Sequence, residues 1–232
     1  NADDWGCNEE ITDRILICYR NGRIHSASAM TFMKDSERAA ELAQDIGLEV
    51  GIHLNLIQEL TGNNVETRLK EYHRAVTSYL KARKINQVLY NPFLRLAFDY
   101  VFNAQWEEFC RIYGYKPTRL DGHHHMHLSM NMLASGQIPK GLKVRRNFTF
   151  GPGEKGIANR LYRHLIDRWL ISRFQCTDFF FSIVPIDKNR HRRLFLLSKK
   201  ADVELMVHPG EDEEYRYLMG ENWLKLISEV ER

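Results

Sequence analysis

The amino-acid sequence predicts an α/β fold in which helices are wound around a mostly parallel sheet, open or closed into a barrel. Segments with helical periodicity alternate along the chain with short apolar extended segments, which is the order typical of parallel sheets. The 232 residues can bury a sizeable core, and no internal repeat or shift in composition divides them. We therefore expect one domain over residues 1–232.

The order of predicted elements follows from hydrophobic periodicity and from the residues that begin and end each segment. They are a helix over 8–21, an extended segment over 24–30, a helix from 35 or 36 to 47, a strand over 48–57, helices over 66–84 and 91–114, a strand leading into 119–127, a strand at 141–147, a helix over about 155–173, a strand around 178–184, a helix near 190–199 and a strand at 202–210.

The helix boundaries rest on capping residues. Asn8 can cap the first helix, and Gly22 ends it. Asp35 or Ser36 can cap the second helix, and the pair Asn91-Pro92 places proline at the first helical position of a later one.

The strand over 48–57 has the clearest pattern. Its leucine, valine and isoleucine residues occupy every second position, and the intervening positions hold Glu49, Gly51, His53 and Asn55. His53 therefore lies on the less apolar face of this strand.

Charge and cysteine content exclude several classes of protein. The formal net charge of +3, from 33 basic and 30 acidic side chains, is too small to indicate a nucleic-acid or membrane partner. The basic run at 188–193 is typical of a solvated helix face. The four cysteines have no CxxC spacing and no apolar run approaches the ~18 residues that span a bilayer, so we expect a cytoplasmic protein with reduced cysteines.

Residues with catalytic chemistry follow four of the predicted strands. Because parallel strands place their carboxyl ends on one rim, we expect these residues to meet there. The segment RLDGHHHMHL at 119–128 holds four imidazoles in five residues, which favours a metal ion or a polar cleft. The residues are Asp3, Asp4, His53, Asp121, His123, His124, His125, His127 and His208.

A carboxylate and two neutral imidazoles with open coordination positions are typical of a divalent metal that activates water. From the residues alone the set is Asp4, His53 and one histidine of the cluster, and Asp3 is then free to act as a general base. Each piece also has a structural alternative, such as a turn at the aspartate pair or at His208.

Four segments in this order resemble the YdjC-like carbohydrate deacetylases, which include bacterial chito-oligosaccharide deacetylases and the hopanoid-biosynthesis-associated deacetylase-like proteins. KPTRLDGHHHMH is the most specific of the motifs. The segments are NADDWG at 1–6, GIHLNL at 51–56, LDGHHHMH at 120–127 and ELMVHPG at 204–210.

The resemblance implies a distorted TIM-like (β/α) barrel with fewer than eight regular strands and one divalent metal ion. It implies Asp4, His53 and His123 as ligands, Asp3 as base and His208 as acid. Zinc or magnesium is the expected ion, with manganese and cobalt left open.

Further residues follow from the resemblance or from their neighbours. An arginine near the base corresponds to Arg145, with Arg146 as the alternative. Residues expected to contact substrate or support the ligands are Trp5, Asp121, His125 and His127. Trp5 can stack on a sugar ring or simply pack in the protein, and which of the two histidines faces substrate is left open.

The sequence departs from the family pattern at both ends. The family has a short apolar strand before NADD, and none precedes Asn1 here, so we expect the first strand to lie in residues absent from this sequence. At the C-terminus we expect one final helix.

The expected function is removal of an acetyl group from an N-acetylated amino sugar or oligosaccharide. This sugar substrate is the expected binding partner of the protein. A metal-dependent phosphoesterase and a non-catalytic carbohydrate- or metal-binding protein are the alternatives. A homodimer is left open.

Overall fold

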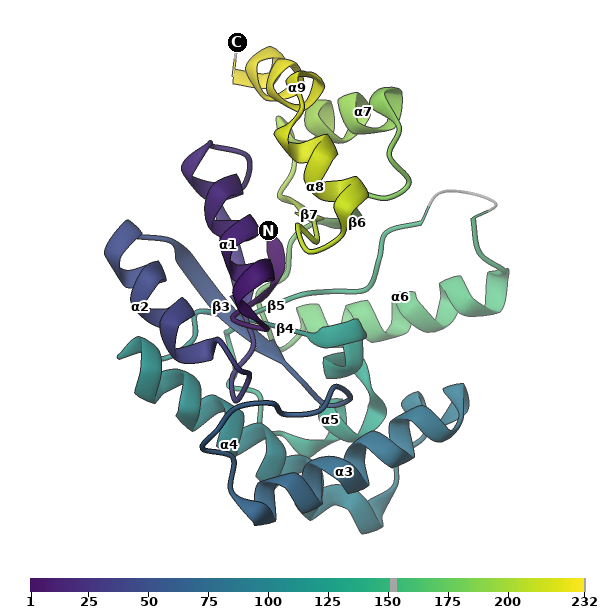
Figure 1. Ribbon diagram of the computed structural model, residues 1–232. Helices are drawn as coiled ribbons and strands as arrows, with labels where there is room; N and C mark the ends of the chain where they lie inside the picture. Colours follow the sequence, from purple (N-terminus) through teal and green to yellow (C-terminus); the bar gives the residue numbers. More distant parts are fainter. Residues whose placement is uncertain (151–153, 232) are drawn as a thin grey trace.

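The computed structural model describes residues 1–150 and 154–231 (Figure 1). Its larger sheet is parallel and has the strand order β1-β2-β3-β4-β5, and β6 and β7 form a parallel pair. The strands are β1 Ala2–Trp5, β2 Ser26–Ala29, β3 Glu49–Leu54, β4 Arg119–Gly122, β5 Lys143–Val144, β6 Phe179–Ser182 and β7 Val203–Met206.

Single bridges join the two sheets into a ring. Ala2 of β1 bridges Val207, just after β7, and Lys143 of β5 bridges Gln175, just before β6. The Val144 N–H donates to the Gln175 carbonyl at 2.8 Å. The result is a distorted barrel with fewer regular strands than eight, and this confirms the predicted fold class.

The first strand differs from the expectation. The structure places β1 over Ala2–Trp5, where it pairs with β2, so the aspartates lie within this strand and do not follow it. Ala2 and Trp5 of this strand are both fully buried.

Helices cover the outer side of the strands (Figure 1). Most predicted helices are confirmed within a few residues. The α-helices are α1 Glu9–Arg20, α2 Ser36–Ile46, α3 Thr67–Ala82, α4 Arg95–Tyr113, α5 Met130–Ser135, α6 Ile157–Ile171, α7 Lys188–Ser198, α8 Asp212–Met219 and α9 Glu221–Glu231, and the 3₁₀ segments are η1 Lys84–Gln87, η2 Pro92–Leu94 and η3 His123–Leu128. None of the helices in the described residues is both long enough and apolar enough to cross a membrane.

The predicted caps hold at the first helix. The Asn8 side chain accepts a hydrogen bond from the Ile11 N–H at 2.9 Å. At the end of α2, Gly47 has a φ of 68°, a left-handed conformation that glycine adopts without strain. At α2, the N-cap residue is Asp35 but its side chain makes no capping bond.

Three predicted elements have different lengths. The helix expected from 91 divides into η2 and α4, and the chain ends in two helices, α8 and α9, instead of one. The strand expected at 141–147 is reduced to Lys143–Val144. Beyond it, the Asn147 N–H donates to the Asp167 carboxylate at 3.0 Å, which removes that group from the ladder.

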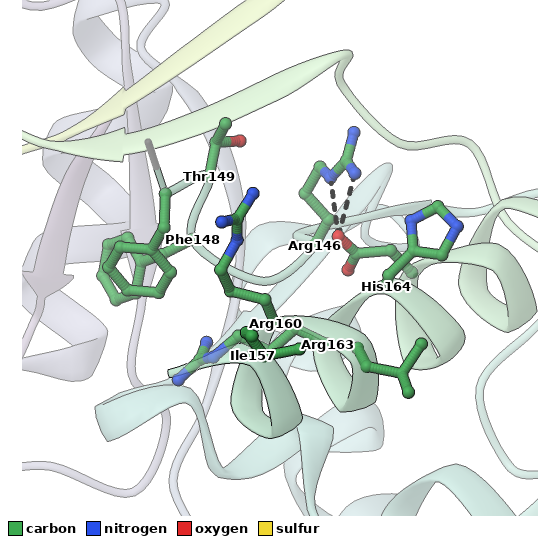
Figure 2. Close-up of a pocket in the computed structure, with 10 residues that line it drawn as sticks. Arg146, Phe148, Thr149, Ile157, Arg160, Arg163 and His164 are labelled. Carbon is green, nitrogen blue, oxygen red and sulfur yellow. Dashed lines mark hydrogen bonds and ion pairs between the residues drawn. The ribbon is translucent and has the colours of Figure 1, made fainter. Parts of the chain in front are cut away.

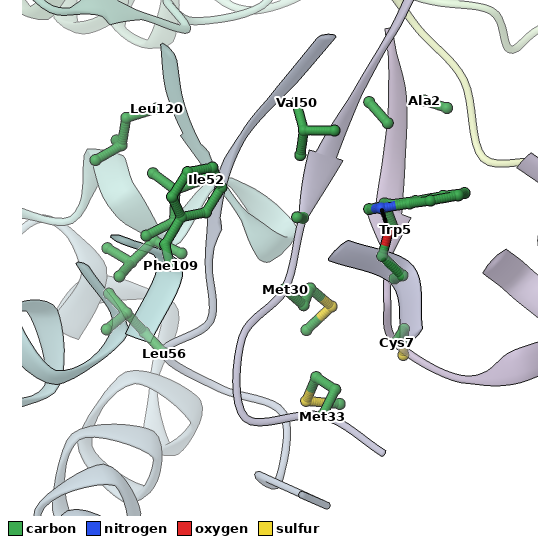
Figure 3. Close-up of a cluster of buried hydrophobic side chains, with 14 of the residues drawn as sticks. Ala2, Trp5, Cys7, Met30, Met33, Val50, Ile52, Leu56, Phe109 and Leu120 are labelled. Atoms are coloured by element: carbon green, nitrogen blue, oxygen red, sulfur yellow. Dashed lines mark hydrogen bonds between the residues drawn. The ribbon is translucent and has the colours of Figure 1, made fainter. Parts of the chain in front are cut away.

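The apolar core lies between the outer face of the sheet and the helices (Figure 3). Ile52 of β3 and Phe109 of α4 are both fully buried in it. Trp5 is 0% exposed, and its indole N–H donates to the Ala39 carbonyl at 3.1 Å. His53 alternates with Ile52 and therefore points to the other face of β3, into the barrel.

Candidate active site

The polar residues predicted to meet do meet, at the carboxyl ends of the strands. His53 of β3 lies between the two aspartates of β1 and Asp121 of β4. His208 follows β7 and approaches Asp3 from the other side of the barrel, with 3.9 Å between His208 Nε2 and Asp3 Oδ2.

The two aspartates reach the same site because β1 is irregular. Successive residues of a regular strand point to opposite faces. Here the register with β2 shifts between Ala2 and Trp5, and Asp4 has a φ of 69°. Aspartate tolerates this left-handed conformation better than most residues, so the chain can turn Asp4 toward the histidines.

Asp4, His53 and His123 form a convergent set of donor atoms. Asp4 Oδ1 lies 2.9 Å from His123 Nδ1 and 3.4 Å from His53 Nε2, and one donor atom from each residue lies within 4.8 Å of the others. Donors that share a metal at about 2.1 Å lie roughly 3 to 3.4 Å apart. The spacing therefore suits one ion.

Asp121 orients His53. His53 Nδ1 lies 2.6 Å from Asp121 Oδ1, and the Ser28 hydroxyl donates to the other oxygen of Asp121 at 2.6 Å. Because Nδ1 faces this buried carboxylate, Nε2 is the nitrogen directed at Asp4. A carboxylate behind a ligating imidazole is the usual arrangement in metal sites. Burial opposes protonation of His53, but Asp3 and Asp121 raise its pKa to about 10.

Arg145 binds three buried carboxylates. Its two terminal nitrogens donate to both oxygens of Asp3 at 2.7 Å, and it also lies 2.9 Å from Asp121 and 2.8 Å from Glu204. Burial by itself raises the pKa of Asp3, but the Arg145 guanidinium holds it well below its usual range. Arg146 instead pairs with Asp167, so Arg145 is the arginine of the site.

The charges of the site favour a bound cation. Asp3, Asp4, Asp121 and Glu204 bring four carboxylates together, and Arg145 supplies one permanent positive charge. Such an excess of negative charge away from water is costly without a counter-ion. A divalent ion bound by Asp4, His53 and His123 would supply this counter-charge. Asp3 and Asp121 already form ion pairs with the Arg145 guanidinium.

His208 is held by a carboxylate of the following helix. Its backbone N–H donates to Glu214 Oε2 at 2.5 Å, and its Nδ1 lies 3.6 Å from Glu214 Oε1. Burial lowers the pKa of His208, but Glu214 and Asp3 outweigh it, so the pKa is raised. A protonated imidazole beside the aspartates is therefore stabilised.

The remaining cluster histidines occupy distinct environments. His127 is fully buried and its Nε2 lies 3.0 Å from the Arg145 carbonyl, to which it can donate. The His125 ring packs edge-on against Phe148, 4.6 Å between centroids, and burial lowers its pKa to about 3. His125 lines a cavity, whereas His127 is fully buried.

Of the two alternatives for Trp5, sugar stacking is wrong and packing in the protein is confirmed. Its side chain is enclosed in the core by α2, so no sugar can stack on it (Figure 3). Ala2 and Trp5 are three positions apart and would lie on opposite faces of a regular strand, so the irregular register of β1 is what places both in the core.

Two adjoining cavities extend along α6. One, of about 430 Å³, is lined by His124 and His125 together with Tyr162 and Asn159. The second, of about 400 Å³, shares Arg146, Phe148 and Arg163 with the first. Arg160 and Arg163 of α6 line the second cavity together with Phe148 and Thr149 (Figure 2).

Sequence reasoning missed three side chains of the site. Ser28 looks like an ordinary small strand residue, and only its contact with Asp121 identifies it. Glu204 is an acidic residue in an otherwise apolar strand, and this pattern could have marked it. Glu214 is one of four consecutive acidic residues at 211–214 that the sequence cannot distinguish.

Comparison with known proteins gives relatives by sequence and by fold. Chitooligosaccharide deacetylases of Yersinia pestis (strain Pestoides F) and Yersinia pseudotuberculosis (serotype O:1b, strain IP 31758) are each 33% identical over 137 residues, which are 55% of this chain and 49% of each relative. The match thus spans about half the length of these relatives.

A solved structure from Enterococcus faecalis V583, described as a "putative cellobiose-phosphate cleavage protein", has a TM-score of 0.70 and 18% identity over 99% of this chain and 93% of its own. That likeness concerns the fold. Residues 1–229 match the family described as YdjC-like protein. Since this match covers nearly the whole chain, the protein belongs to the YdjC-like family.

Proposed function

We propose that this protein is a metal-dependent hydrolase that removes the acetyl group from N-acetylated amino sugars or their oligosaccharides. The observation that carries the proposal is the convergence of the Asp4, His53 and His123 donors, with Asp3 on one side and His208 nearby. The deacetylase names of the sequence relatives support the same reaction class.

Asp3 is the proposed general base. A divalent ion held by Asp4, His53 and His123 would polarise the acetyl carbonyl and lower the pKa of the attacking water. Asp3 takes one proton from that water as the oxygen bonds to the carbonyl carbon. Arg145 donates hydrogen bonds to both oxygens of Asp3, which keeps the carboxylate ionised and oriented before the reaction.

His208 is the proposed general acid. The amine of an amide is a poor leaving group unless it is protonated as the C–N bond breaks. A protonated His208 gives its proton to that nitrogen, and the products are acetate and the free amino sugar. The raised pKa of His208 supports this protonation state near neutral pH.

The cavities along α6 are the proposed place for the rest of the sugar. Tyr162, Phe148 and His125 offer ring faces or edges, and Asn147 and Asn159 offer amide hydrogen-bonding groups. Sugars are recognised by this mixture of apolar rings and directed polar groups.

One well-formed metal position speaks against the phosphoesterase alternative. Two-metal phosphoesterases hold ions about 4 Å apart. The second acidic group, Asp3 with His53 and Asp121, contacts the Arg145 guanidinium, which takes the place of a second cation.

Acetate release from a panel of N-acetylated mono- and oligosaccharides, with and without a chelator, tests the function. We expect release that the chelator abolishes and that added divalent metal restores. Sugar binding without acetate release would instead indicate a non-catalytic binding protein. Phosphate release from a sugar phosphate, with two metal ions per chain, would indicate the phosphoesterase.

A further inference from the structure

Glu214 is buried although it belongs to an exposed acidic turn. The neighbouring residues 211–213 are exposed, whereas Glu214 is 5% exposed at the first turn of α8. Burial of a carboxylate is costly unless its oxygens are paired. Both oxygens of Glu214 face His208.

The two oxygens contact different parts of His208. Oε2 accepts the backbone N–H, and Oε1 lies 3.6 Å from Nδ1 of the ring. Nε2, on the far side of the ring, is then the nitrogen that approaches Asp3, at 3.9 Å. Glu214 and Asp3 thus lie at opposite ends of one imidazole.

Other contacts anchor the turn itself. The Glu211 N–H donates to the His208 carbonyl at 2.9 Å, and Arg14 of α1 donates to the Gly210 carbonyl at 3.0 Å. Gly210 also packs so closely on Ile11 that an added Cβ would lie 3.0 Å from Ile11 Cγ1. The backbone of the turn is therefore held without the ring contact of Glu214.

We propose that Glu214 is the positioning residue for His208: its carboxylate faces Nδ1, stabilises the protonated ring and directs Nε2–H into the site. The inference rests on the proposed role of His208 as the acid. It adds a carboxylate–imidazole pair on the acid side, separate from the Asp121–His53 pair on the metal side.

The charged groups facing His208 set the direction of the effect. They are Asp3 and Asp4 on β1, Glu214 on α8 and His124 on η3. The three carboxylates favour the protonated ring and His124 opposes it if charged. Removal of the Glu214 charge therefore lowers the pH at which His208 loses its proton.

Glu214→Gln tests the proposal, because glutamine keeps the shape and one oxygen that can accept the His208 backbone N–H. Glu213→Gln, an exposed neighbour on the same helix, is the matched control. In the metal-loaded enzyme we expect amide turnover to fall about tenfold near neutral pH, a part of the 10²–10⁴ that a positioned acid contributes. The alkaline limb of the pH–rate profile should move to lower pH, and the control should match wild type.

A direct titration separates this inference from the proposed function. In the zinc-loaded protein labelled at histidine, the His208 ring signal, assigned by its loss in His208→Asn, should titrate at lower pH in Glu214→Gln than in wild type. This shift supports the pairing even if wild type releases no acetate, a result that would refute only the proposed function. An unchanged titration, with or without a lower melting temperature, would give Glu214 a purely structural role and overturn the proposal.

Discussion

The β1–β4 half of the barrel and the β5–β7 half are built differently. In the first half, called the regular half although β1 itself is irregular, nearly every residue of the four strands is buried. Pairing over four residues occurs in both halves, between β2 and β3 and between β6 and β7. In the second half, called the irregular half, β5 has two residues, and three of the four residues of β6 and two of the four of β7 are only partly buried. Single bridges at Lys143 and Ala2 connect this half to the first.

The two halves carry different parts of the proposed chemistry. All three metal donors, Asp4, His53 and His123, come from the regular half or the turn directly after it. The proposed acid His208 follows β7 in the irregular half, and the cavities along α6 are lined by this half and, in part, by η3 of the regular half. Metal coordination tolerates errors of only about 0.5 Å, whereas binding of varied sugars needs room. The proposed donors thus lie in the more deeply buried half of the barrel.

The largest effect is expected from removal of a donor in the regular half. His123→Ala should lose the metal and the hydrolytic activity together, by about 10⁴-fold or more, because the proposed shell has only three protein ligands. Elemental analysis and acetate release measure both quantities.

His124→Ala is the matched control. Among the described residues, Asp4 bonds to the neighbouring His123 ring, and no hydrogen bond or ion pair joins Asp4 to His124. It should keep its metal. Full metal occupancy in His123→Ala would remove this residue from the ligand set.

A smaller loss is expected from replacement of Asp3, which lies next to the bridge between Ala2 and Val207 that joins the two halves. Asp3→Asn retains the shape of the side chain but cannot take a proton from water, so turnover should fall by roughly 10²–10⁴ with metal content unchanged. Asp121 and Glu204 still pair with Arg145, which should preserve the fold. Near-normal turnover would move the base to another residue, with Asp121 the next candidate.

Replacement of the acid in the irregular half should discriminate between substrates. His208→Ala is expected to slow N-acetyl hydrolysis by about 10²-fold or more while an activated aryl acetate, whose leaving group needs no proton, is spared. Parallel assays and a melting curve measure this. Equal losses on both substrates, with a lower melting temperature, would reduce His208 to a structural residue of the turn.

The smallest effect concerns stability and belongs to the regular half. Burial raises the pKa of Asp121, but Arg145 and His53 outweigh burial and lower it from 3.8 to about 2. Asp121 should therefore contribute about 2 kcal/mol to the free energy of unfolding at neutral pH.

Because the folded pKa is depressed, this contribution is complete above pH 4 and disappears as the pH falls toward 2. Denaturant unfolding of wild type and Asp121→Asn should differ at pH 7 and converge in acid. Asp45→Asn, at an exposed position, is the control. A difference independent of pH would show that the Asp121 charge does not stabilise the fold.

Local signals in the sequence predicted most of the regular half. The strict alternation at 48–57 predicts both β3 and the inward direction of His53, and Asn8 and Gly47 predict helix ends. These signals are local because capping and strand periodicity depend on neighbouring residues. The short β5 was not predictable, since the N–H of Asn147 is taken by a carboxylate 20 residues away.

By itself, the sequence determined the fold class, the order of the elements and the residue types gathered at strand ends. Only the tertiary structure decided which of them touch. In the tertiary structure Trp5 points into the core, and Arg145, not Arg146, contacts Asp3. These side-chain directions depend on the irregular register of β1 and on the register between β4 and β5. Pairing between residues as distant as Asp3 and Arg145 results from the closing of the ring, which no local pattern specifies.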